Sequence, residues 1–326
     1  MTTQLPEGYS TRPALADDIA QLAVLDATYT RSVVGKALRN ENEIRTEWKS
    51  PTFDPATDSQ VVVFVEDEII GWCEVYDQAP HTRISSRLRV SPASDRCVAT
   101  RLIEWCIERA RCGANQAAAG ERVILTQAAF ESDVAGTARL KAMGFKFCRC
   151  FLGMRIEMAT PPLGAIWPDG ILVRSMIPGQ DDRAAVEAVR DAFRDHWGYV
   201  ESSLEEDLEE WRQWIYEDED FDTDLWFLAM DGDEIAGFCQ CYPIAGDDPA
   251  TGLVDELGVR PPWRRRGLAT ALLRHAFRAF YDRGVRNVEL GVDAESPTGA
   301  TDLYERAGMR VMWKNLVHEL ELRPGG

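Results

Sequence analysis

The chain has 326 residues, of which 45% are apolar and 28% charged, so it is long enough for two globular domains that each bury a core. Its formal net charge of −18 argues against binding to nucleic acid or to an anionic membrane surface, because both need clustered positive charge. The longest purely apolar stretches fall well short of the roughly 20 residues that span a bilayer. The first residues have neither the basic nor the apolar part of a signal peptide. We therefore expect a soluble, cytoplasmic protein.

Cysteine and histidine residues are scattered along the chain. There are eight cysteines and four histidines, and no two cysteines form a Cys-x-x-Cys pair. A zinc site needs closer spacing than this. We expect no metal, and we expect reduced cysteines that pack as small hydrophobic residues.

The two halves of the chain resemble each other at an offset of about 164 to 170 residues. Three pairs of segments match: 65–76 with 231–242, 88–103 with 257–273, and 139–147 with 303–311. Two copies of one domain explain these matches most economically. We expect domains at residues 1–158 and 171–326, joined by a linker at 159–170 that contains three prolines and two glycines.

The second copy has regular patterns throughout, and its elements are expected in the order strand, two helices, hairpin, strand, helix, strand, helix and final strands. Their expected bounds are 171–175, 181–193, a helix within 201–224, 225–230 and 235–242, 251–259, 268–284, 287–293, 299–308 and 310–322. Pro261 and Pro262 stop a strand, and Gly284 and Gly308 each end a helix. This order predicts an α/β domain with a mixed sheet.

Residues 201–224 carry twelve acidic residues and a single basic one, Arg212. Leucine, tryptophan and isoleucine recur in this segment at helical spacing, which predicts an amphipathic helix with an acidic outer face. Two interpretations stay open. The face either keeps the protein solvated or attracts a cationic substrate.

The most distinctive motif is RRRGLA, residues 264–269, which follows the strand at 251–259 and opens the helix at 268–284. Free backbone N–H groups and the positive end of the helix dipole make such a position a site for anions. Gly267 would let the backbone approach a phosphate closely. The alternative is a solvated arginine cluster at a helix start.

This motif resembles the Arg/Gln-x-x-Gly-x-Gly/Ala pyrophosphate loop of the GNAT acyltransferase superfamily. Segments 257–261 (LGVRP) and 303–309 (LYERAGM) also resemble that family, with Tyr304 37 residues after Gly267. The resemblance covers residues 171–320. It implies two tandem GNAT-like domains, each with a mixed, mostly antiparallel sheet flanked by helices, and acetyl-CoA or another acyl-CoA as the donor.

The resemblance also implies where the donor binds. The strand at 251–259 separates from the strand at 287–293, and the acyl-pantetheine arm fills the gap. Main-chain groups there bond the arm and the thioester oxygen, the loop after them holds the diphosphate, and Ser296 stands where the family has an asparagine. The implied donor-site residues are Leu257, Gly258, Val259, Arg264, Arg265, Arg266, Gly267, Leu268, Ala269, Thr270 and Ser296.

By the same resemblance, Tyr304 is the general acid that protonates the departing CoA thiolate; the alternative is a tyrosine on the buried face of its helix. Asp255 and Glu256 are the candidate general bases, and strand alternation predicts that they point to opposite faces. Either could instead be an ordinary strand acid or a helix partner. Many family members carry a glutamate inside the fifth strand, where this chain has the segment 290–292 (LGV).

His196 and Trp197 follow the first helix of the second copy, in a loop that borders the acceptor site in this family. His196 could act as an acid or a base there, because its pKa lies near neutrality. The alternatives are a histidine that caps the helix and a tryptophan that belongs to the core.

The first copy lacks the residues that the resemblance assigns to chemistry. Gly267 aligns with Cys97, Asp255 and Glu256 with Ser86 and Arg87, and Tyr304 with Leu140. Asp95 brings a carboxylate to the place of the phosphate. We expect residues 1–158 to be a degenerate, non-catalytic domain.

These observations predict an N-acetyltransferase that moves acetyl from acetyl-CoA to the amine of a small molecule, which could be polycationic, by direct attack in a ternary complex. Two alternatives stay open. One is an acyl-CoA-binding sensor or scaffold without turnover. The other follows from the tandem plan, which is similar to that of mycothiol synthase, and is acetylation of a cysteinyl amino-sugar. We expect a monomer or homodimer, and no nucleic-acid or membrane partner.

Overall fold

The computed structural model describes residues 3–326, apart from the side chains of Glu66, Trp214 and Glu217, and the chain forms two compact units. Unit 1 comprises residues 3–150 together with Trp313–Gly326, and unit 2 comprises Phe151–Met312.

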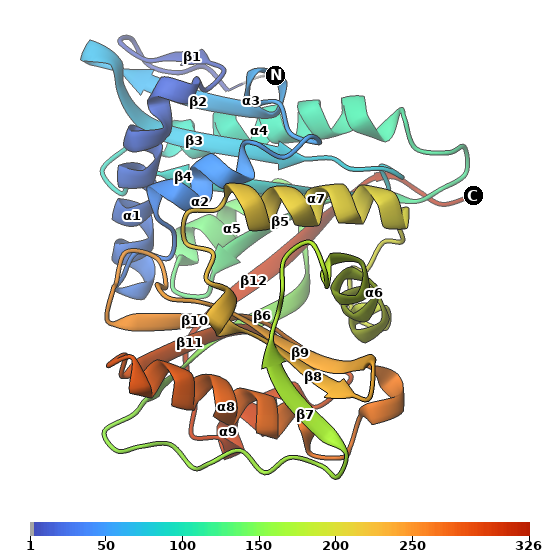
Figure 1. Ribbon diagram of the computed structural model, residues 1–326. Coiled ribbons are helices and arrows are strands. Elements are labelled where there is room, and N and C mark those ends of the chain that lie inside the picture. Colours follow the sequence, from blue (N-terminus) through green and yellow to red (C-terminus); the bar gives the residue numbers. More distant parts are fainter. Residues whose placement is uncertain (1–2) are drawn as a thin grey trace. The chain divides into compact units, whose positions relative to one another are not determined.

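Unit 2 contains the elements of the second copy in the expected order (Figure 1). They are β7 (Ile171–Ser175), α6 (Asp182–Phe193), α7 (Leu204–Glu217), β8 (Trp226–Asp231), β9 (Glu234–Tyr242), β10 (Thr251–Val259), α8 (Leu268–Asp282), β11 (Asn287–Asp293) and α9 (Ala300–Arg306). A 3-10 turn at Pro261–Trp263 ends the run after β10, as the two prolines predict.

The sheet of unit 2 has the strand order β7-β8-β9-β10-β11-β6, where β6 is Lys146–Glu157. Only β10 and β11 run parallel, and the other neighbours are antiparallel. The prediction of a mixed, mostly antiparallel sheet is therefore confirmed.

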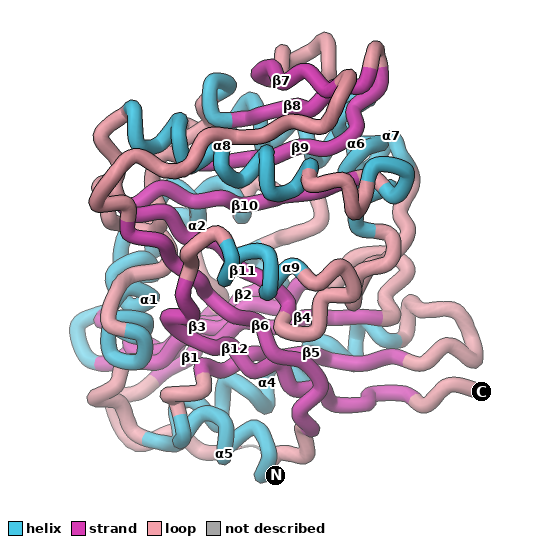
Figure 2. The backbone as a smooth tube through the Cα atoms, turned by 90° about the horizontal axis from the view of Figure 1, so that it is seen from below, coloured by secondary structure: helices cyan, strands magenta, loops and turns pink. Residues whose placement is uncertain are grey.

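Helices cover both faces of this sheet, and two consecutive residues of β9 identify the faces. Phe238 packs against Phe193 of α6, with ring centroids 6.0 Å apart. A Cβ at Gly237, which points the other way, would lie 3.2 Å from Leu272 of α8. Thus α6 covers one face together with α7, while α8 lies across β8, β9 and β10 on the other (Figure 2).

Unit 1 repeats this architecture. Its elements are β1 (Ser10–Arg12), α1 (Ile19–Val34), α2 (Glu41–Glu47), α3 (Pro55–Asp58), β2 (Ser59–Phe64), β3 (Glu68–Tyr76), β4 (Arg83–Val90), α4 (Arg96–Ala114), β5 (Val123–Phe130) and α5 (Val134–Ala142). The strand order is β1-β2-β3-β4-β5-β12, with β12 at Arg310–Arg323, and only β4 and β5 are parallel. Gly71 and Trp72 face opposite helices, as Gly237 and Phe238 do.

The last strand of each repeat belongs mainly to the sheet of the other unit. Residues 151–157 of β6 pair with β11 in unit 2, and residues 315–323 of β12 pair with β5 in unit 1. The bounds of the two units therefore differ from the domains expected at 1–158 and 171–326. The difference arises because both final strands have the same alternating pattern, which does not say which sheet a strand joins.

Candidate active site

A cavity of about 510 Å³ opens in unit 2 where β10 and β11 separate. Their parallel pairing runs from Thr251 to Val254 on β10 and stops there, while β10 continues to pair with β9 as far as Val259. Leu257, Gly258 and Val259 line the cavity, as the resemblance implied. The separation of the two strands is thus where the sequence predicted it.

The loop after β10 presents unpaired backbone N–H groups to this cavity. Helix α8 begins at Leu268 after Gly267, whose φ of +84° is left-handed and whose position gives no side-chain cap. Arg265 also has a positive φ, of +63°. Among the described residues, the N–H groups from Arg265 to Thr270 have no hydrogen-bond acceptor. This left-handed backbone conformation favours glycine at 267. A Cβ there would have no atom within 4 Å, so the cost of another residue would be backbone strain and not a steric clash.

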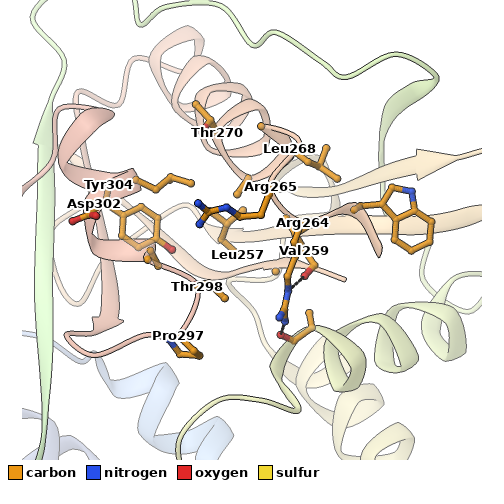
Figure 3. A pocket seen from close by; sticks show the side chains of 18 of the residues that line it. Leu257, Val259, Arg264, Arg265, Leu268, Thr270, Pro297, Thr298, Asp302 and Tyr304 are labelled. Carbon is orange, nitrogen blue, oxygen red and sulfur yellow. Dashed lines mark hydrogen bonds between the residues drawn. The ribbon is translucent and has the colours of Figure 1, made fainter. Parts of the chain in front are cut away.

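The three arginines of the loop have different environments. Arg264 is held by the protein itself: Nε donates to the Val259 carbonyl at 3.1 Å, Nη2 donates to the Ala192 carbonyl at 2.8 Å, and the guanidinium pairs with Asp195. Arg265 lines the cavity and is exposed (Figure 3). Arg266 is exposed and lies outside the cavity lining. The Arg264 side chain therefore positions the loop, which leaves the N–H groups and Arg265 to face an anion.

Tyr304 reaches into the same cavity from α9 and is 7% exposed. Figure 3 shows its ring and the Arg265 side chain pointing into one shared space. Burial, and to a smaller degree the nearby Cys239 thiol, raises the pKa of Tyr304 above its ordinary value. The phenol therefore keeps its proton at neutral pH and can act as an acid.

Asp255 and Glu256 lie at a β-bulge, which overturns the expectation that they point to opposite faces. Val254 pairs with Cys241 and Glu256 with Gln240, so two residues of β10 oppose a single step of β9. This extra residue places Asp255 and Glu256 on the face opposite to Val254. Neither lines the donor cavity.

Both carboxyls have pKa values above their ordinary range. Removal from water raises the pKa of Glu256 to about 8, with a further contribution from Asp255. Removal from water also raises the pKa of Asp255 to about 6, and the charge of Asp218 adds to this. Because Asp255 is exposed, solvent screens its charge, and the upward shift of its pKa is smaller than that of the half-buried Glu256. Neither carboxyl has an ion pair with a described residue, so no neighbouring cation lowers its pKa.

Of the remaining predicted residues, five line the cavity: Gly267, Leu268, Ala269, Thr270 and His196. His196 lies there with its Nδ1 3.2 Å from Asp195 and its ring 4.9 Å from that of Phe193. Trp197 lies outside the lining and packs near Phe151, at 6.1 Å between centroids. Ser296 lies outside it too, and its hydroxyl is 2.9 Å from that of Thr298, which does line the cavity.

Several lining residues were missed by the sequence analysis: Phe193, Trp263, Pro297, Thr298, Asp302 and Arg306. Trp263 could have been noticed as the residue immediately before the arginine run. Thr298 could have been noticed as the next hydroxyl after Ser296. The others give no signal without the fold, because they come from α6, from α9 and from the loop before α9.

Several acids of residues 201–224 are paired within unit 2. Glu205 pairs with Arg183 at 2.7 Å, Asp207 pairs with Arg190, and the Glu206 side chain caps the start of α7 with Ser203. These contacts support the interpretation of α7 as a solvated helix more than that of an attracting field.

In unit 1 the corresponding site is closed. The cavity between β4 and β5 measures about 40 Å³, and Leu140 replaces the tyrosine. The Tyr29 ring lies there, with its hydroxyl 3.0 Å from Asp133 and the Arg89 guanidinium 5.1 Å from its centroid. At the start of α4, Asp95 accepts a hydrogen bond from the N–H of Cys97 at 3.3 Å, so the chain's own carboxylate occupies the anion position.

Among the described residues, no group of three histidine, cysteine or acidic side chains is arranged so that it could hold a metal ion. No described helix has the length and apolar character needed to cross a membrane.

Comparison with known proteins gives consistent matches. The profile of the Acetyltransferase (GNAT) family matches residues 186–309. The chain is 34% identical over 168 residues to the mycothiol acetyltransferase of Paenarthrobacter aurescens (strain TC1), and the alignment covers 49% of each chain, so it spans about half the length of that relative.

Two solved structures match almost the whole chain. The crystal structure of a GCN5-related N-acetyltransferase from Sphaerobacter thermophilus has a TM-score of 0.80 and 31% identity, covering 99% of this chain and 98% of that one. A tandem GNAT protein from the clavulanic acid biosynthesis pathway has a TM-score of 0.71 at 18% identity, covering 98% of this chain and all of that one, which shows the same fold.

Proposed function

Since the chain belongs to the GCN5-related N-acetyltransferase (GNAT) family, we propose that unit 2 transfers acetyl from acetyl-CoA to the amine of a small molecule by direct attack in a ternary complex. The observation that carries this proposal is one cavity in which an uncapped helix start, a separation of two strands and a buried tyrosine meet. Each of these three features serves a different part of the reaction.

Donor binding uses the loop and the strand before it. The N–H groups from Arg265 to Thr270 and the dipole of α8 bind the diphosphate, and Arg265 and Arg266 add positive charge. Main-chain groups from Leu257 to Val259, on the edge that no longer pairs with β11, bond the pantetheine arm. A donor N–H there also stabilises the negative charge that develops on the thioester oxygen.

The reaction needs a base for the amine and an acid for the thiolate. A protonated amine gives a proton to a carboxylate of the Asp255–Glu256 pair and then attacks the thioester carbonyl carbon. The C–N bond forms, the C–S bond breaks, and the thiolate takes a proton from Tyr304. The carboxyl proton and the second nitrogen proton leave to solvent, from which Tyr304 is reprotonated. The raised pKa values of the two carboxyls lie near the working pH, as a general base requires.

The acceptor site is proposed to lie beside the donor cavity and not inside it. We place the acceptor between His196, which walls the cavity, and the carboxyl pair on β10. Trp197 is retained in this proposal as a residue of the acceptor loop. A polycationic acceptor would add to the attraction by the carboxyl pair, but the paired acids of α7 offer it little more.

Unit 1 is proposed to be non-catalytic. Its closed cavity, its capped α4 and Leu140 each remove one of the three features that unit 2 combines. One molecule of donor therefore binds per chain.

The name of the relative from Paenarthrobacter aurescens favours one acceptor, a cysteinyl amino-sugar of the kind that mycothiol synthesis would use. The competing function is an acyl-CoA sensor without turnover. Tyr304 argues against a sensor, because a general acid has no use in binding alone.

The deciding experiment incubates the purified chain with acetyl-CoA and a panel of amines that includes polyamines, aminoglycosides, amino acids and cysteinyl amino-sugars. Free thiol is followed by absorbance, and the acetylated product is identified by mass spectrometry. Transfer to at least one amine supports the proposal. Tight donor binding without thiol release across the whole panel would support the sensor instead.

A further inference from the structure

The bulge in β10 gathers three polar side chains on the face of the sheet that α6 and α7 cover. Asp255 and Glu256 lie on β10, and Gln240 lies on β9 directly opposite Glu256. Gln240 lines a small void with Trp211 of α7, which places its amide on that face. Its side chain is 6% exposed, yet no described residue forms a hydrogen bond with the amide. The amide atoms are not among the fully buried polar atoms that lack a partner, so water reaches them and a polar group of a bound molecule could take its place.

Unit 1 provides an internal comparison at the same register. The pairing of β3 with β4 places Glu74 opposite Arg87, just as the pairing of β9 with β10 places Gln240 opposite Glu256. The Arg87 guanidinium lies 3.4 Å from Glu74 and 2.7 Å from Glu47. The indole N–H of Trp48 donates to Glu74 at 2.7 Å, so the polar groups are satisfied within unit 1.

The comparison shows what unit 2 lacks. Where unit 1 has the cation of Arg87, unit 2 has the carboxyl of Glu256, and Asp255 adds a second acid next to it. No described residue forms an ion pair with either carboxyl in unit 2, and no cation contributes to the pKa of either one. A bound molecule with a positive charge would therefore find both carboxyls unpaired.

We propose that the ammonium group of the acceptor fills this place, so that the acceptor is an amine without a carboxylate on the carbon next to its nitrogen. This inference rests on the proposed function of unit 2 and adds the class of amine to it. The ammonium donates charge-assisted hydrogen bonds to Asp255 and Glu256. The Gln240 amide, which can both donate and accept, binds a neutral hydroxyl or amide of the acceptor.

An α-amino acid does not fit the same site. Its carboxylate would lie one carbon away from the ammonium and hence beside two acidic side chains. Like charges repel, and no described cation is paired with Asp255 or Glu256 to compensate. The site thus attracts the ammonium group of an amine and repels the carboxylate of an α-amino acid.

The test uses pairs of acceptors that differ by one carboxylate: tyramine with tyrosine, histamine with histidine, and ethanolamine with serine. Initial rates with saturating acetyl-CoA give kcat/KM for each member. We expect the amine to exceed the amino acid by at least about tenfold in every pair that reacts. The carboxamide of each amino acid, which keeps the size and loses the charge, should react like the amine.

The variant Glu256→Gln removes the carboxyl that would ionise when an ammonium binds beside it, and it should reduce the amine-to-amino-acid ratio at least about threefold. Glu209→Gln, which removes an exposed acid of α7, is the matched control and should leave the ratio unchanged. Calorimetric binding of the same pairs to the chain saturated with CoA gives a readout without turnover. Equal or better use and binding of the amino acids would overturn the inference. Selective binding of the amines with no acetylated product from any of them would instead overturn the proposed function and leave the inference standing.

Discussion

Arg264 and Asp195 form a bidentate ion pair, with Nη1 2.5 Å and Nη2 3.0 Å from the two carboxylate oxygens. The hydrogen bonds from Arg264 hold the pKa of Asp195 below its ordinary range. Asp195 also lies 3.2 Å from the ring of His196, so the pair joins the loop before α8 to the wall of the cavity. The first arginine of the motif thus acts through the position of the loop.

Replacing either partner should loosen that loop. We expect Asp195→Asn and Arg264→Gln each to weaken acetyl-CoA binding about tenfold, because the N–H groups lose their fixed direction. Arg264→Lys should weaken acetyl-CoA binding nearly as much as Arg264→Gln does, since an ammonium does not form a bidentate pair. Calorimetric titration with acetyl-CoA measures the change. Arg278→Gln, on the exposed face of α8, is the control, and an effect as large there would remove the special role of Arg264.

Gly267→Asp should abolish measurable donor binding, or weaken it at least about a hundredfold. The change strains a left-handed position and puts a negative charge where the diphosphate binds. Titration of the unchanged chain should give about one site, because the start of α4 in unit 1 is already capped by Asp95. Two equivalent sites would contradict the proposed difference between the units.

Tyr304→Phe should lower kcat by about ten- to a thousandfold and leave acetyl-CoA affinity nearly unchanged, because the variant loses a proton donor and little packing. Stopped-flow measurement of thiol release under conditions where chemistry limits the rate tests this. A wild-type rate under those conditions would take Tyr304 out of the mechanism.

The matching position in unit 1 gives a control for that variant. Leu140 is fully buried, so Leu140→Ala should cost about 2–5 kcal/mol of the free energy of unfolding of unit 1. Donor affinity per folded molecule should not change. Urea unfolding and calorimetry on the same preparation separate the two effects.

Much of unit 2 could be predicted from the sequence because its signals are local. The strand expected at 287–293 is β11 with the same bounds, and the strand expected at 251–259 is β10. Gly267 indicates a left-handed backbone position, and the arginine run lies directly before the start of a helix. Each of these signals depends on residues within a few positions of one another.

The features that were missed depend on contacts between distant residues. Arg264 pairs with a residue 69 positions away, which no local pattern indicates. The bulge at Asp255 needs the register of β9, since alternation along β10 alone predicts the wrong face for one of the two acids. The same holds for the exchange of β6 and β12, whose patterns are alike.

The raised pKa of Glu256 makes a prediction about stability against pH. Its pKa in the folded chain is about 8, against an ordinary value of 4.5. Below pH 4.5 the group is protonated in both the folded and the unfolded chain, and its effect on folding is fully favourable. As the pH rises from 4.5 to 8, the unfolded chain ionises while the folded chain keeps the proton, so stability is lost over this window.

Glu256→Gln should not suffer that loss, because glutamine does not titrate. We expect the melting temperature of the variant, relative to the unchanged chain, to rise by at least about 2 °C between pH 5 and pH 9, a shift that corresponds to roughly 1 kcal/mol for a domain of this size. Scanning calorimetry at the two pH values measures it. Glu209→Gln should show a constant difference across the same range, because its carboxyl is exposed on α7. If the two variants gave parallel curves, Glu256 would be ionised in the folded chain at neutral pH, and the carboxyl pair would hold two negative charges rather than one.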